Sequence, residues 1–137
     1  GLMASIAELR TALATNLGTI PGLRTSEFIP DNPSPPIAIV QFDRAQYHLD
    51  MRNGMAEYNF VVQLIVGRVD ERTAQRNLDA YCSSTGASSV LLAVESDRTL
   101  NNKAFDCVVT EMSSYGPVLI NDITYLGAEY QIRVLAS

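Results

Sequence analysis

Histidine, tryptophan and cysteine are the residue types that this sequence has least of: one histidine, no tryptophan and two cysteines among 137 residues. A Ser-His-Asp or Cys-His catalytic site would have to use His48, and neither Cys82 nor Cys107 lies in a motif of reactive thiols. One histidine and two separated cysteines provide no spaced ligand set for a metal ion. We therefore expect no enzyme activity and no metal. A small hydrolase that pairs His48 with an acidic residue remains the enzyme alternative.

The sequence also lacks long apolar runs, a basic-then-apolar signal segment, and the glycine patterns GxGxxG and GxxxxGK[ST]. Ten basic and fifteen acidic residues give a net charge of −5, which argues against general electrostatic binding of nucleic acid. These absences exclude a membrane span and the usual phosphate-binding loops, and we expect no contact with a membrane.

Lysine is nearly absent as well, because nine of the ten basic residues are arginine and only Lys103 is lysine. Arginine is enriched at protein interfaces and lysine is depleted there, but the codons of a GC-rich genome explain the same bias. Cys82 and Cys107 have no CxxC spacing, so we interpret them as small buried apolar residues, and nothing requires a disulfide between them.

What is present suits one ordinary globular domain over residues 1–137, because 47% of the residues are hydrophobic and 18% are charged. Gly1 and Leu2 precede Met3, which suggests a cloning remnant at residues 1–2. Four of the six prolines fall within residues 30–36, where we expect an extended connection rather than a domain boundary.

Three helices are predicted from apolar spacing and capping residues. Ser5 and Glu8 form a capping box at the start of a helix over residues 5–17. A second helix is expected to begin at Asp70 as its N-cap and to end at Gly86, and a third to begin at Ser88 or Ser89.

Strands are predicted at residues 23–28, 37–42, 57–68, 103–112 and 128–136. Between the last two, we expect a turn at the "SSYGP" stretch 113–117 and a strand or connector at 118–127. Apolar residues on both faces of 57–68 indicate a strand that is covered on both sides. The order α-β-β-β-α-α-β-β predicts an α+β fold, a small and mostly antiparallel sheet with two to three helices packed on one face.

An Asn53-Gly54 pair precedes the strand 57–68 and is the strongest short hairpin signal in the chain. Met51, Arg52 and Met55 flank this pair, and flexible methionine and arginine side chains suit contact surfaces. We therefore predict that residues 48–57 form an arm that docks on another protein or subunit.

Three arginines recur at intervals of four residues: Arg68, Arg72 and Arg76. This spacing predicts that Arg72 and Arg76 share one face of the second helix and that Arg68 lies in the segment leading into it. A solvated helix face is the simplest interpretation. The functional alternative is a contact in which these arginines pair with carboxylates of a partner, and a nucleic-acid stripe is the third option.

The stretch "YNFVVQLIVGRVDERTAQRNLDAYCSSTGASSVLLAV" at residues 58–94 resembles the tail terminator (tail completion) proteins of long-tailed phages, especially those of actinobacteria. The flanking blocks "FIPDNPSPPIAIVQF" and "ITYLGAEYQIRVLA" stand in the same order as in that family. The resemblance extends from Ser5 to Ala136 and rests on the order and spacing of the blocks.

This resemblance implies an α+β virion protein without catalytic residues or cofactors. It implies a hexameric ring at the head-proximal end of the tail, which caps the tail tube, stops its polymerisation and presents a surface to the neck proteins. The tail-tube protein and a head-completion protein would be its partners, after assembly in the host bacterial cytoplasm. DNA would pass through the lumen without specific binding, which an acidic protein suits because a negative lumen would not trap the duplex.

Three alternatives stay open beside the tail terminator. A head-tail joining protein or a tail-tube subunit is the closest of them, because these proteins have related small α+β folds. The small hydrolase is the second, and a module that binds a small molecule or a peptide is the third.

Overall fold

The computed structural model describes residues 5–28, 34–50 and 55–136, with the backbone alone for residues 48–50, and its fold is α+β. The helices are α1 (Ile6–Leu17), α2 (Ala74–Cys82), α3 (Val90–Val94) and a 3-10 turn η1 (Glu95–Asp97). The strands are β1 (Arg24–Ser26), β2 (Ile37–Asp50), β3 (Met55–Arg68), β4 (Asp106–Ile120) and β5 (Ile123–Ala136). The predicted order of helices and strands is confirmed.

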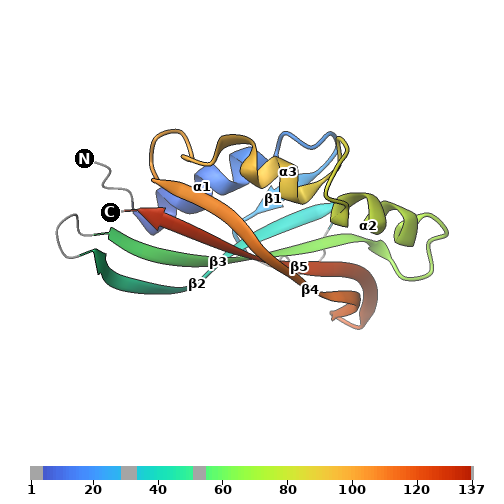
Figure 1. Cartoon of the computed structure of the whole chain (residues 1–137). Coiled ribbons are helices and arrows are strands. Elements are labelled where there is room, and N and C mark those ends of the chain that lie inside the picture. Colours follow the sequence, from blue (N-terminus) through green and yellow to red (C-terminus); the bar gives the residue numbers. More distant parts are fainter. Residues whose placement is uncertain (1–4, 29–33, 51–54, 137) are drawn as a thin grey trace.

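The strands form one sheet in the order β1-β2-β3-β5-β4, in which β1 runs parallel to β2 and all other neighbours are antiparallel. The helices lie together on one face of this sheet (Figure 1). The predicted fold class, a mostly antiparallel sheet with helices on one face, is therefore confirmed.

The first helix begins as its capping box predicts. The Ser5 hydroxyl accepts a hydrogen bond from the Glu8 N–H at 3.1 Å, and the Glu8 carboxylate accepts one from the Ser5 N–H at 3.3 Å. Leu9, Leu13 and Leu17 lie on the face that packs on the sheet, and all three are fully buried. Burial of such a leucine side chain contributes about 1.5–3 kcal/mol, so this face holds α1 on the sheet.

The main core lies between the helices and the sheet. Phe60 and Ile132 on neighbouring strands are buried at its centre, and the Phe42 ring meets the Phe60 ring edge-on at 5.5 Å. Cys107 belongs to this core, and burial raises the pKa of its thiol to about 12. Both cysteines are free, Cys107 buried and Cys82 half-buried, which agrees with the interpretation of Cys107 as a small apolar residue.

The predicted start and end of the second helix are wrong. Asp70 is exposed in a turn, and α2 begins only at Ala74 with Thr73 in the N-cap position. The Glu71 N–H bonds the Arg68 carbonyl and the Ala74 N–H bonds the Glu71 carbonyl, so tight turns occupy this segment instead of helix. At the other end α2 stops at Cys82, four residues before Gly86, whereas Ser89 caps α3 as predicted.

The predicted turn at residues 113–117 is also wrong, because β4 continues through it. Ser114 and Gly116 adopt positive φ there, and the register with β5 shifts between Ser113 and Gly116, which marks a bulge. The chain turns at Asn121-Asp122, whose φ angles of 48° and 66° lie between the paired Ile120 and Ile123. Positive φ at both central residues is the requirement of a tight type I′ hairpin.

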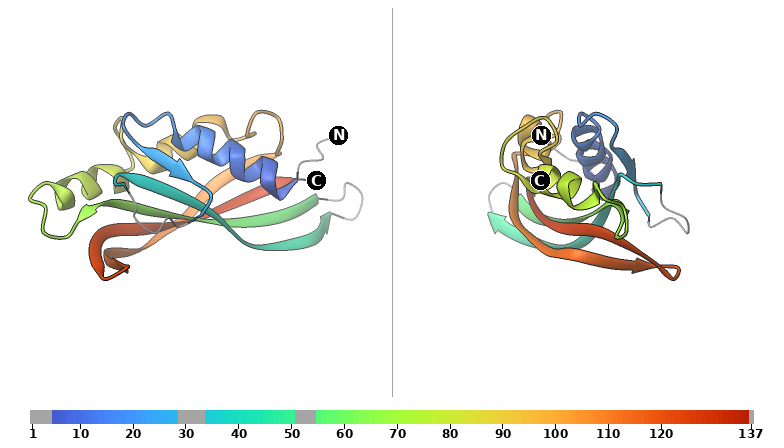
Figure 2. Two further views of the ribbon diagram at one scale, coloured as in Figure 1. Left: turned by 180° about the vertical axis from the view of Figure 1, so that it is seen from behind. Right: turned by 90° about the vertical axis from the view of Figure 1, so that its right-hand side faces the viewer.

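The sheet bends at Gly127 of β5. Gly127 pairs with Ile65 on one side and with Gly116 on the other, next to register shifts in both β3 and β4. Beyond this point the end of the β4–β5 hairpin curls below the sheet, on the side away from the helices (Figures 1 and 2). Bulges bend the strands that contain them, and glycine permits a tight bend, so the two features together at Gly127 allow the sheet to curve there.

The curled hairpin builds a second, smaller cluster on the helix-free face, from Ile37, Ile39, Ile65 and Tyr125. The prediction that β3 is covered on both faces therefore holds at Ile65, which is fully buried. It does not hold along the whole strand, because Asn59, Val61 and Gln63 on the same face are only half-buried.

Candidate functional site

The three arginines of the predicted interface are exposed, but they do not share one helix face. Arg68 is the last residue of β3, Arg72 lies in the turn before α2, and only Arg76 is helical. The prediction that Arg72 and Arg76 lie on one face of the same helix is wrong, because the helix starts two residues after Arg72. All three nevertheless belong to the end of the molecule where β3 passes into α2.

Charge at this end is balanced rather than basic. Asp70, Glu71 and Asp79 lie in the same stretch of chain as the three arginines and are equally exposed. The ion pairs among the described residues are Arg98–Asp106, Lys103–Glu8 and Arg133–Glu57, so no described carboxylate forms an ion pair with Arg68, Arg72 or Arg76. A patch with balanced charges suits a specific contact better than general attraction of an anionic polymer.

Apolar side chains at the same end were missed by the sequence interpretation. Val69 donates its N–H to the Thr124 carbonyl, and Thr124 pairs with Leu119 across the hairpin, so Val69 and Leu119 flank Thr124 in one row. Leu119 is 69% exposed and Val69 is 46% exposed. Tyr115 is also exposed and donates its hydroxyl to Asp79 of α2, a hydrogen bond that raises the pKa of Tyr115.

We call Arg68, Val69, Arg72, Arg76, Tyr115 and Leu119 the α2-end surface. Arginine and tyrosine are enriched at protein interfaces, and the buried centre of an interface is more apolar than the rest of the protein surface.

The predicted hairpin arm lies at the opposite end of the same strands. Met51, Arg52, Asn53 and Gly54 fall outside the described residues, whereas Met55 is the first residue of β3 and pairs with Asp50 of β2. Beside the arm, Tyr47 is 61% exposed, and its ring meets the Tyr58 ring edge-on at 6.4 Å. The side chain of His48 also falls outside the described residues, so the hydrolase alternative gains no support here.

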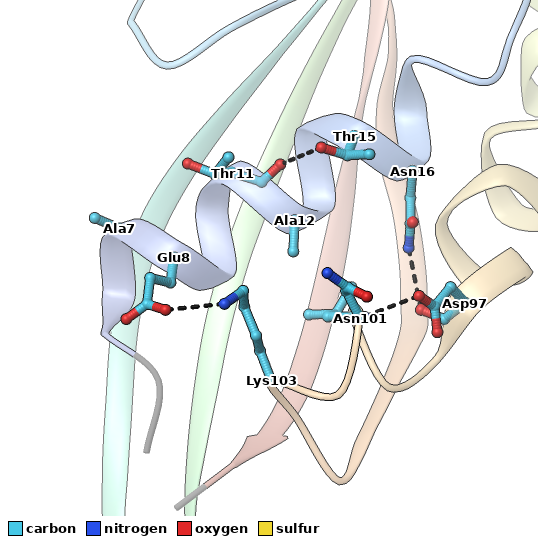
Figure 3. A pocket seen from close by; sticks show the side chains of 10 residues that line it. Ala7, Glu8, Thr11, Ala12, Thr15, Asn16, Asp97, Asn101 and Lys103 are labelled. Atoms are coloured by element: carbon cyan, nitrogen blue, oxygen red, sulfur yellow. Dashed lines mark hydrogen bonds and ion pairs between the residues drawn. The ribbon is translucent and has the colours of Figure 1, made fainter. Parts of the chain in front are cut away.

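A groove opens between α1 and the loop that follows η1 (Figure 3). Its volume is about 510 Å³. The α1 wall carries Ala7, Glu8, Thr11, Ala12, Thr15 and Asn16, and the loop wall carries Asp97, Leu100, Asn101 and Lys103. This is within the size range of small-molecule sites, which are about 300–1,000 Å³.

Hydrogen bonds and an ion pair fix both ends of this groove. At one end the Lys103 ammonium bonds the Glu8 carboxylate at 3.0 Å and lowers the pKa of Glu8. At the other end the buried Asn16 amide donates to the carbonyls of Val94 and Asp97, each at 3.1 Å. The walls are therefore held in place by their own chain, without a ligand.

The loop wall contains a rare backbone conformation. Leu100, Asn101 and Asn102 have φ angles of 50°, 57° and 64°, so three successive non-glycine residues are left-handed. The Asp97 carboxylate holds this turn by accepting the Asn101 N–H at 2.8 Å, a bond that also lowers the pKa of Asp97. Left-handed conformations cost about 1–2 kcal/mol for ordinary residues such as leucine, and full burial of Leu100 offsets the cost.

The described residues contain no group of three or more His, Cys, Asp or Glu side chains placed to hold a metal ion. No helix in the same part of the chain is long and apolar enough to cross a bilayer.

Comparison of the chain with protein-family models gives no match, and a search of curated proteins gives none either.

Proposed function

We propose that this chain is a subunit of a phage tail terminator: a ring that caps the head-proximal end of the tail tube, stops tube polymerisation and docks the neck. One observation carries the proposal. The resemblance extends from Ser5 to Ala136, and its quoted blocks at residues 28–42, 58–94 and 123–136 follow one another in the family's order. These blocks fall on β2, β3, α2, α3 and β5. The α+β fold, with a mostly antiparallel sheet and helices on one face, suits this role.

The separation of the two candidate interfaces on the subunit supports the proposal of a ring. A head-to-tail contact that closes on itself needs two different patches on each subunit, on separate parts of its surface. The arm at Met55 and the α2-end surface at Arg68 stand at opposite ends of β3, whose 14 residues correspond to roughly 45 Å of extended chain. We propose that the α2-end surface contacts a neighbouring subunit, and that the arm contacts the tail tube or a neighbouring subunit.

Charge reversal of two arginines tests this assignment. The double variant Arg72→Glu, Arg76→Glu is expected to abolish the ring, because like charges would then meet at a contact built for pairing. Light scattering after size exclusion should show a single subunit instead of about six, on the protein alone or after release from tail tubes.

The matched control is the double variant Arg24→Glu, Arg44→Glu, which changes the net charge equally at exposed positions on β1 and β2. It should form rings like the unmodified protein. Intact rings in the Arg72/Arg76 variant would reject the α2-end surface as a subunit contact.

A head-tail joining protein or a tail-tube subunit is the nearest alternative within the same apparatus. The position of the ring distinguishes them, because a tube subunit would continue the tube and a terminator would end it.

A small-ligand module is a second candidate function, and the groove beside α1 is the observation that favours it. Saturable binding of a small molecule that is lost in Ala7→Trp, at the groove, and kept in Ala80→Trp, an exposed position on α2, would support this function.

A further inference from the structure

The last strand of the sheet is β4, and no strand of the described residues pairs along its outer edge. Such edges are sites of self-association unless the protein blocks them. The N–H groups of β4 point alternately toward β5 and away from it, and those of Cys107 and Val109 bond to side chains rather than to β5. These two N–H groups therefore mark the outward edge.

Each of the two outward N–H groups is occupied by a carboxylate of the same chain. Glu95 of η1 accepts the Val109 N–H at 3.0 Å, and Asp106 accepts the N–H of the next residue, Cys107, at 2.9 Å. Arg98 holds Asp106 in place through two parallel hydrogen bonds of 2.8 Å. Hydrogen bonds to ionised groups are stronger than neutral ones, so an incoming strand would have to displace two strong acceptors.

The remainder of β4 is protected by backbone irregularity. The register with β5 shifts at Thr110 and again between Ser113 and Gly116, and Pro117 has no N–H to donate. Bulges and proline on an edge both prevent regular pairing. The two longest stretches in regular register with β5 are Asp106 to Val109 and Gly116 to Ile120. Pro117 interrupts the donors of the second stretch, and the carboxylates cover the first.

Apolar side chains next to the stretch from Asp106 to Val109 would favour a docked strand if the edge were open. Phe105 precedes it and is 42% exposed, and Met112 follows it and is 40% exposed. An edge with exposed apolar neighbours is the kind at which proteins self-associate. The carboxylate caps are thus placed where self-pairing would otherwise be most favourable.

We propose that the Glu95 and Asp106 carboxylates cap the β4 edge and thereby prevent a second copy of this chain from pairing a strand with it. When one of these carboxylates is removed, the outward N–H groups donate to carbonyl groups on the same edge of another copy, and the two sheets join through antiparallel β4 strands. This inference does not depend on the proposed ring, because it concerns an additional contact that the unmodified protein prevents.

The test removes one capping carboxylate at a time. Glu95→Ala frees the Val109 N–H, whereas Glu95→Gln keeps an oxygen acceptor at the same place and serves as the matched control. At equal concentration, Glu95→Ala should have about twice the mass of the unmodified protein by light scattering, and Glu95→Gln should match the unmodified protein.

Amide hydrogen exchange at Val109 distinguishes strand pairing from unspecific aggregation. In Glu95→Ala the amide should exchange about tenfold faster than in the unmodified protein at low concentration, since one charged hydrogen bond is lost, and should become protected as the concentration rises. Asp106→Ala should show the same pattern at Cys107, which keeps the test valid if Glu95→Ala folds poorly. Unchanged mass in both variants, or a higher mass with Val109 and Cys107 still unprotected, would overturn the proposal.

Discussion

Replacing Gly127 with alanine is expected to lower the free energy of unfolding by about 3 kcal/mol or more, the largest effect expected for alanine at any of the described glycines. A Cβ atom at this position would lie 2.2 Å from the carbonyl oxygen of Leu64. That oxygen belongs to the backbone of the central strand β3, so it cannot move aside as a flexible side chain would.

The effect of Gly127→Ala should reach beyond the point of contact, because the sheet bends there. To relieve the clash, β5 would have to separate from β3 beside the register shift at Ile65 and Gly67. The small cluster around Ile65 and Tyr125 on the helix-free face would then lose its packing.

Thermal unfolding followed by circular dichroism measures this prediction. The control is Gly18→Ala at the end of α1, where an added Cβ would have no neighbour closer than 3.4 Å and φ is −65°. Gly18→Ala should leave the midpoint nearly unchanged, while Gly127→Ala should lower it by more than about 10 °C for a domain of this size. Equal midpoints for the two variants would show that the sheet does not depend on this close approach.

Replacing Asn16 with aspartate is expected to cost about 3 kcal/mol or more at neutral pH, although the two side chains have the same shape. The Asn16 amide group donates to the carbonyls of Val94 and Asp97, and the side chain is 7% exposed. Aspartate would direct a buried negative charge at two carbonyl oxygens and would leave both without their donor. The anchor between α1 and the α3–η1 segment would be lost.

The cost of Asn16→Asp should depend on pH in a definite direction. Burial and the facing carbonyls raise the folded-state pKa of the new carboxyl above its unfolded value of about 3.9. The destabilisation relative to the unmodified protein should therefore be smaller below pH 4 and should grow as the pH rises above the unfolded pKa.

Urea unfolding at pH 4 and pH 7 measures this difference. Asn77→Asp is the control, because Asn77 is exposed on α2 and the substitution adds the same charge. A pH-independent cost in Asn16→Asp, equal to that of Asn77→Asp, would mean that the Asn16 hydrogen bonds do not hold α1 to the α3–η1 segment.

The parts of the fold that the sequence predicted correctly depend on local signals. The Ser5–Glu8 capping box and the spacing of Leu9, Leu13 and Leu17 act within one helix, so α1 was predicted to within a residue. The alternation of Tyr130, Ile132 and Val134 likewise reveals which face of β5 is buried.

The parts that were predicted wrongly depend on competition between signals. Gly116 and Pro117 suggest a turn in the sequence, but both pair with β5 directly after a bulge. Asn121-Asp122 forms the turn because Asn and Asp tolerate positive φ. Asp70 is a good helix cap, yet the chain leaving β3 makes tight turns first, so the helix begins at Ala74.

The candidate sites were only partly predictable for a similar reason. Arg68, Arg72 and Arg76 were found from their spacing, although the start of α2 places Arg72 outside the helix. Val69, Tyr115 and Leu119 look like ordinary core residues in the sequence, but all three are exposed in the structure. The groove depends on three successive left-handed residues, a conformation that Leu100 gives no reason to expect.

Electron microscopy of the purified protein mixed with tail tubes that lack their terminator tests the central proposal most directly. We predict rings of about six subunits at one end of each tube, and tubes that no longer grow when tube protein is added. Rings that bind along the tube walls, tubes that continue to grow through the added protein, or bare tube ends beside unbound protein would contradict the proposed function.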